Sequence, residues 1–305
     1  MAPSQKFVMR SALLSERFSI ELTADEFNKF NKCRLFLSDY MKMEEDSVQL
    51  LLSLQDFERF IFDCALEHRL FPSYGIDYTR DIRLRANLRV ISFLNSLSSL
   101  RDQFPRFRSA TLGIDLREKF RSLWHETKSK NVTFWFCERI RNFAQHQTQP
   151  ISFHVTGSQW DKDRIFNESY AAIYVDVEEV VAHREIKREE AESYRAHFGR
   201  RADLSLVIRE ASSCTAQIIK KMRTVTTEDY ENSYKTYAQF LARAEAAGAQ
   251  LRYCHIASLI DDLDHEKYEV FGEFLERAAY LRRHPLAINN HSHFISNKAL
   301  GHQRE

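Results

Sequence analysis

Glycine and proline are scarce in this chain, with only 7 glycines and 5 prolines among 305 residues. These two residue types mark most tight turns and loops. A chain with so few of them is expected to form long helices joined by few connections. The same scarcity argues against an all-β sandwich and against a fold that holds nucleotides on glycine-rich loops.

The composition is that of a folded globular protein. Apolar residues make up 44% of the chain and charged residues 29%, which is too apolar for a disordered chain. No segment approaches the roughly 20 consecutive apolar residues of a membrane span, and the first residues lack the pattern of a secretory signal. The five cysteines are scattered without CxxC spacing, which predicts reduced thiols and a cytoplasmic location.

Helical periodicity and capping signals predict a helical bundle within residues 1–150. Thr23 and Glu26 have the spacing of a capping box, which should begin a helix that ends near residue 43. The first 22 residues alternate weakly, as a short strand or an extended arm does. Further helices are expected at 45–70, 78–103, 115–128 and 131–148.

The pattern changes after Pro150. Two β-rich runs predict a β-hairpin or small sheet within 151–182, and a helical region follows at 183–285. Residues 286–305 are expected to form a loose polar tail. The predicted fold class is therefore mainly α, a helical bundle with a small β-hairpin insertion and additional C-terminal helices. Those helices are expected at about 185–222, 227–247 and 264–283.

Charge is unevenly distributed along the chain. Fourteen basic and six acidic side chains lie between Arg80 and Arg141, a formal +8, although the whole chain carries +1. A local basic surface is compatible with a polyanionic partner such as RNA, and solvated helix faces are the alternative. The candidate RNA-binding residues in this segment are Arg85, Arg89, Arg106 and Arg108.

The segment 134–146 has the most varied chemistry in the chain. On a helical wheel one face is wholly apolar, and the other combines arginine, amide, carboxylate and imidazole groups. Ordinary surface faces hold mostly lysine and glutamate. The polar face consists of Glu138, Arg139, Arg141, Asn142, Gln145 and His146.

These groups suit cleavage of RNA without a metal ion. The reaction deprotonates a ribose 2′-hydroxyl and protonates the leaving 5′-oxygen, and histidine can do either near neutral pH. Arginine matches the phosphate oxygens and stabilises the charge that develops on them. One helix offers only one such set, so two copies facing across a dimer would supply a separate acid and base.

The run Arg141-Asn142-Phe-Ala-Gln-His146 resembles the Rx4–6H motif of the HEPN superfamily, whose all-helical domains occur in metal-independent ribonucleases, toxins and antiviral effectors. The resemblance implies a helical bundle, a symmetric homodimer with both motifs at its interface, and RNA cleavage that leaves a cyclic phosphate. By position, Arg141, Asn142 and His146 match the catalytic residues. Glu138, Arg139 and Gln145 are possible auxiliary residues. The resemblance covers roughly 70 to 100 residues around the motif.

Two functional hypotheses follow. The first is a toxin-like or defensive endoribonuclease that acts on RNA as a homodimer, with a possible regulatory or neutralising protein partner, no membrane association and no cofactor. The second is a catalytically inactive HEPN-like scaffold or RNA-binding subunit. The bare spacing also occurs as Arg139…His146 and Arg277…His284. No metal site is expected, since the histidines at 291, 293 and 302 lie in the polar tail.

Overall fold

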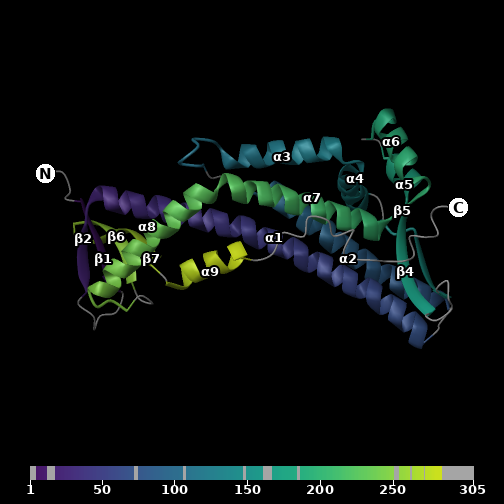
Figure 1. The fold of residues 1–305 in the computed structure, drawn as a ribbon, viewed down its shortest axis with the longest axis horizontal. Helices are drawn as coiled ribbons and strands as arrows, with labels where there is room; N and C mark the ends of the chain where they lie inside the picture. Colours follow the sequence, from purple (N-terminus) through teal and green to yellow (C-terminus); the bar gives the residue numbers. More distant parts are fainter. Residues whose placement is uncertain are drawn as a thin grey trace. The chain divides into compact units, whose positions relative to one another are not determined.

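The computed structural model describes residues 5–11, 18–71, 75–105, 108–146, 149–160, 167–183, 186–250, 254–261, 263–270 and 272–283. The described chain is mainly helical and has two small antiparallel sheets (Figure 1), which confirms the predicted class at this level of detail. None of its helices is long and apolar enough to cross a membrane. The elements are β1 (Gln5–Ser11), β2 (Ser19–Leu22), α1 (Ala24–Leu70), α2 (Ile76–Asp102), α3 (Leu116–Lys130), α4 (Val132–His146), β3 (Phe153–Trp160), β4 (Asn167–Asp176), α5 (Val177–Val181), α6 (Arg188–Phe198), β5 (Arg201–Asp203), α7 (Leu204–Val225), α8 (Thr227–Ala246), β6 (Cys254–Ile260), β7 (Leu263–Val270) and α9 (Gly272–Arg283).

The chain divides into two compact units, each made from separated stretches of sequence. The first unit combines residues 1–45, 105–119 and 222–285, and the second contains 46–104 and 120–221. The helices α1, α3 and α7 contribute residues to both units. The predicted domains 1–150, 151–182 and 183–285 are each one continuous stretch of sequence. The two units differ from them because each combines stretches that are far apart in the sequence and in contact in the fold. The predicted tail, 286–305, lies outside the described residues.

The first unit is built on a four-stranded antiparallel sheet in the order β2-β1-β6-β7. β1 pairs with β6 from the far end of the chain, with Val8 opposite Ala257. The helix predicted at 264–283 is wrong in its first part, because residues 263–270 form β7 and the helix α9 begins at Gly272. β7 is an exposed, charged edge strand, and its pairing with β6 rather than any local pattern makes it a strand.

Helix α1 begins as predicted and continues past its predicted end. The Thr23 backbone N–H donates to Glu26 Oε2 at 2.8 Å, and the Glu26 N–H donates to Thr23 Oγ1 at 3.1 Å, which confirms the capping box. The predicted break between residues 43 and 45 is absent, and α1 runs unbroken to Leu70. Glu44 is 0% exposed and accepts two hydrogen bonds from Arg223 at 2.7 and 2.6 Å, so a buried ion pair occupies the expected joint.

The second unit contains the predicted hairpin. β3 and β4 pair antiparallel, with Phe153 opposite Tyr174, and β5 extends this sheet from the other side of β4. The continuous helix predicted from about residue 185 to 222 is wrong, because α6, β5 and α7 replace it. Gly199 ends α6 with a φ of +67°, a backbone conformation that other residues adopt only at a cost, and this turn separates the two helices.

Candidate functional site

Helix α4 carries the predicted catalytic residues within the second unit. The Oδ1 of Asn131 accepts a hydrogen bond at 2.7 Å from the backbone N–H three residues later, so this amide caps the start of the helix. Phe136 and Ile140 are 0% exposed and Phe143 is 2% exposed. These values confirm that one face of α4 packs into the core.

Glu138 is held in place by three donors. Its Oε1 accepts hydrogen bonds from Arg101 and from the Trp124 indole, each at 2.8 Å, and Lys128 Nζ lies 2.7 Å from its Oε2. Burial alone would raise the pKa of Glu138, but the Lys128 contact, the Trp124 hydrogen bond and the charge of Arg101 together hold that pKa below its ordinary value. Glu138 therefore joins α4 to α2 and α3 as a buried anion.

Arg139 is likewise bound within the chain. Its Nε and Nη2 donate to Glu190 at 2.5 and 3.0 Å, and the Tyr194 hydroxyl donates to the same carboxylate at 2.7 Å. Glu190 is 5% exposed. This buried pair connects α4 to α6, so the Arg139 guanidinium is already occupied by a carboxylate.

Arg141 and Asn142 have no such attachment. Arg141 Nη1 donates to the neighbouring Asn142 Oδ1 at 3.3 Å, and both side chains are half-buried. The Arg141 Nε is buried without a hydrogen-bond partner, and Arg141 makes no ion pair with any described residue. Gln145 is exposed on the next turn. His146 closes the helix, and its side chain lies outside the described part of the structure.

The four candidate RNA-binding arginines occupy different settings. Arg85 Nη1 lies 3.6 and 3.9 Å from the carboxylates of Asp81 and Glu67, and Arg89 Nε lies 3.5 Å from Asp56. Arg85 and Arg89 also lie over the ring of one phenylalanine, Phe60, on α1. Arg106 lies outside the described residues, and Arg108 belongs to the first unit rather than the second.

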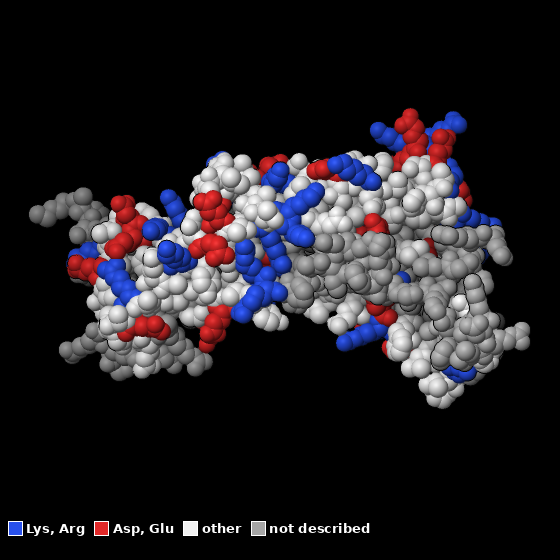
Figure 2. Space-filling model, in the orientation of Figure 1, with Lys and Arg blue, Asp and Glu red and all other residues white. Residues whose placement is uncertain are grey.

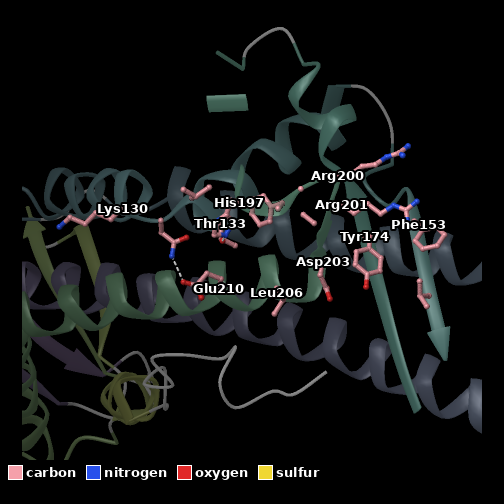
Figure 3. A pocket seen from close by; sticks show the side chains of 16 residues that line it. Lys130, Thr133, Phe153, Tyr174, His197, Arg200, Arg201, Asp203, Leu206 and Glu210 are labelled. Atoms are coloured by element: carbon pink, nitrogen blue, oxygen red, sulfur yellow. Dashed lines mark hydrogen bonds between the residues drawn. The ribbon is translucent and has the colours of Figure 1, made fainter. Parts of the chain in front are cut away.

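Two clefts of the second unit were not predicted. The first has a volume of about 1040 Å³. Its lining side chains come from several segments and lie side by side in space, with Lys130 at one end and Phe153 at the other (Figure 3). The second, of about 520 Å³, lies between the start of α2 and β3, and is lined by Arg80, Arg83 and His154. The pair of adjacent arginines at 200 and 201, directly after Gly199, is the sequence signal that could have pointed to the first cleft.

No cluster of three or more potential metal ligands occurs among the described residues. The histidines at 291, 293 and 302 lie outside them. All five cysteines lie within the described residues and none forms a disulfide; Cys254 and His255, 2% and 3% exposed, are adjacent buried residues on β6.

No family model, curated protein or solved structure matches this chain. Over the described residues, the fold and site define a mainly helical chain with two small sheets and a half-buried arginine–asparagine pair near the end of α4.

Proposed function

We propose that this chain is a metal-independent endoribonuclease of HEPN type, with Arg141, Asn142 and His146 as its catalytic residues. One observation carries the proposal: Arg141 and Asn142 contact each other, and Arg141 has no carboxylate partner among the described residues. A guanidinium without a carboxylate keeps its charge available for a phosphate group.

The other two arginines with the motif spacing are less suitable. Arg139 is bound to the buried carboxylate of Glu190. Arg277 Nη2 lies 3.0 Å from Glu45 Oε1, in the first unit. The ion pairs therefore favour Arg141 among three arginines that spacing alone could not separate.

The proposed reaction uses each residue in a definite role. His146 of one copy accepts the proton of the ribose 2′-hydroxyl, whose oxygen attacks the adjacent phosphorus. The bond to the 5′-oxygen breaks, and His146 of the second copy protonates this leaving oxygen, so the products are a cyclic phosphate and a 5′-hydroxyl. Arg141 stabilises the charge on the phosphate oxygens, and Asn142 orients the phosphate or the imidazole.

An enzyme that cuts cellular RNA harms its own cell unless it is controlled. The proposal therefore includes a toxin-like or antiviral role, action in the cytoplasm, and a regulatory or neutralising protein partner.

Cleavage of labelled RNA in EDTA tests the enzyme. His146→Ala and Arg141→Gln are each expected to lower the rate at least a hundredfold, because each removes a group that acts on the reacting atoms. Glu192→Gln, at an exposed position on α6 of the same unit and outside the motif, should retain the wild-type rate. Circular dichroism checks that all three variants are folded. Full activity of the His146 and Arg141 variants in EDTA would overturn the proposal.

A second candidate function is a non-catalytic RNA-binding or dimerising subunit. One observation favours it: Glu138 and Arg139, two groups of the same polar face, are occupied by contacts within the chain. Such a subunit would bind RNA with a steep salt dependence and leave it intact in the same assay.

A further inference from the structure

Phe153 belongs to both clefts of the second unit. It begins β3 and is 40% exposed. The Arg201 guanidinium lies over its ring, 4.2 Å from the centroid. Ile76, which lines the second cleft, is 81% exposed. An exposed aromatic ring with an arginine beside it is the arrangement on which nucleobases stack in proteins that bind single strands.

Unpaired cations lie on both sides of Phe153. Arg80 and Arg83 line the second cleft, Arg201 lines the first, and none of the three makes an ion pair with a described residue. Arg200, also in the first cleft, is 79% exposed and lies 3.8 Å from Asp176. Arg80, Arg83 and Arg201 thus differ from Arg85 and Arg89, whose carboxylate neighbours were described above, whereas Arg200 has such a neighbour in Asp176.

The two acidic residues that line the first cleft, Asp203 and Glu210, make hydrogen bonds within the chain. Asp203 is 3% exposed, burial raises its pKa, and its Oδ1 accepts a hydrogen bond from the Ser205 backbone N–H at 2.7 Å. Figure 3 shows Asp203 beside Tyr174, with Arg200 and Arg201 extending away from it. Glu210 accepts a hydrogen bond from Asn131 at 2.7 Å. None of the described residues that line the second cleft is acidic.

We propose that the two clefts form one path for single-stranded nucleic acid, in which a base stacks on Phe153 and arginines 80, 83, 200 and 201 contact the phosphates. The choice of RNA over DNA rests on the function proposed above. The path itself concerns binding alone and does not depend on cleavage.

Stacking is tested by fluorescence anisotropy with a labelled 12-nucleotide RNA of mixed sequence, in EDTA and with the Arg141→Gln background to prevent turnover. Phe153→Leu keeps an apolar side chain and removes the aromatic face, so it should weaken binding about tenfold. Phe62→Leu is the matched control, because Phe62 is a 66% exposed phenylalanine of the same unit outside both clefts. It should bind as the background protein does.

The phosphate contacts are tested by the salt dependence of the same binding. For single strands, each lost phosphate contact makes the slope of log K against log salt shallower by about 0.7. The double variant of Arg80→Gln and Arg83→Gln should therefore reduce the slope by about 1.4. Arg188→Gln with Arg195→Gln is the control on α6, where Figure 2 shows basic and acidic side chains mixed and both arginines have glutamate partners. This control should leave the slope unchanged.

The outcomes distinguish the proposed nucleic-acid-binding path from the proposed ribonuclease activity. Loss of binding in the cleft variants, with cleavage absent from every protein, supports the path and overturns the ribonuclease. Cleavage by the wild type with unchanged binding in the cleft variants overturns the path alone. A DNA strand that binds as tightly as RNA supports the path and removes the preference for RNA. Duplex RNA that binds equally well, with no effect of Phe153→Leu, overturns the stacking role.

Discussion

Glu138 combines burial with negative charge in a single residue. It is 8% exposed, and its pKa is lowered because Lys128, Trp124 and Arg101 outweigh the effect of burial. A group with a lowered pKa contributes stability that is present above the unfolded pKa, about 4.3, and is lost as the pH falls through the folded value. The ion pair should therefore stabilise the protein at neutral pH and cease to do so in acid.

Glu138→Gln is expected to lower the free energy of unfolding by about 2 kcal/mol at pH 7, since it leaves two cations without their shared partner. Urea unfolding at pH 7 and at about pH 3.5 measures the difference in the free energy of unfolding between variant and wild type. This difference should be smaller at the lower pH. Glu126→Gln, which removes an exposed i,i+4 pair with Lys130, should cost under about 0.5 kcal/mol. If Glu138→Gln lowered the free energy of unfolding equally at both pH values, Glu138 would not be a buried anion with a lowered pKa.

Helix ends are the element-scale features on which the first cleft depends. Gly199 joins α6 to β5 at a φ of +67°, and the two residues after it are Arg200 and Arg201. No heavy atom lies within 4 Å of a Cβ added at this glycine, so a substitution there acts through the backbone. The turn therefore sets the direction of both arginines.

Gly199→Ala should destabilise the fold by about 1–3 kcal/mol and also weaken RNA binding, because the strained turn shifts Arg200 and Arg201. Gly248→Ala is the matched control: its φ is +84°, the space around it is also open, and it lies in the first unit. Thermal unfolding should show a loss of stability in both variants, with weaker binding in Gly199→Ala alone. Unchanged binding in Gly199→Ala would contradict the role of this turn.

Several elements were predictable from local signals. The capping box at Thr23, the hairpin of β3 and β4, and the helices α2, α3 and α4 all follow from residues close together in sequence. The strands β5, β6 and β7 were missed for different reasons. β5 has three residues, and β6 and β7 join a sheet whose central pairing connects Val8 with Ala257. The pairing of β1 with β6 over such a separation leaves no local pattern, whereas β7 pairs with the strand just before it but is too uniformly exposed to show the alternation of a half-buried strand.

Dimer formation belongs to the scale of the whole molecule. The proposed site takes one His146 from each copy, so activity requires a mass twice that of the 36.0 kDa chain. Light scattering during size exclusion should show this mass at the concentrations where cleavage is measured. Excess His146→Ala protein, once subunits exchange, should suppress wild-type activity by forming mixed dimers. An active monomer would contradict the two-copy site.

The sequence by itself determined that the chain is mainly helical, where most of its helices lie, and that one helix has an apolar face opposite a face of mixed polar groups. Helical periodicity and capping depend on residues within a few positions of each other, so a linear reading recovers them. Only the tertiary structure decided which polar groups of that face are paired within the chain and which are left to contact a ligand. Arg139 and Arg141 are two positions apart on α4, yet Arg139 contacts Glu190, 51 residues later, and within the described part of the chain the Arg141 side chain donates only to its neighbour Asn142. Ion pairing depends on distance in space, and folding alone brings that carboxylate to one arginine and not to the other.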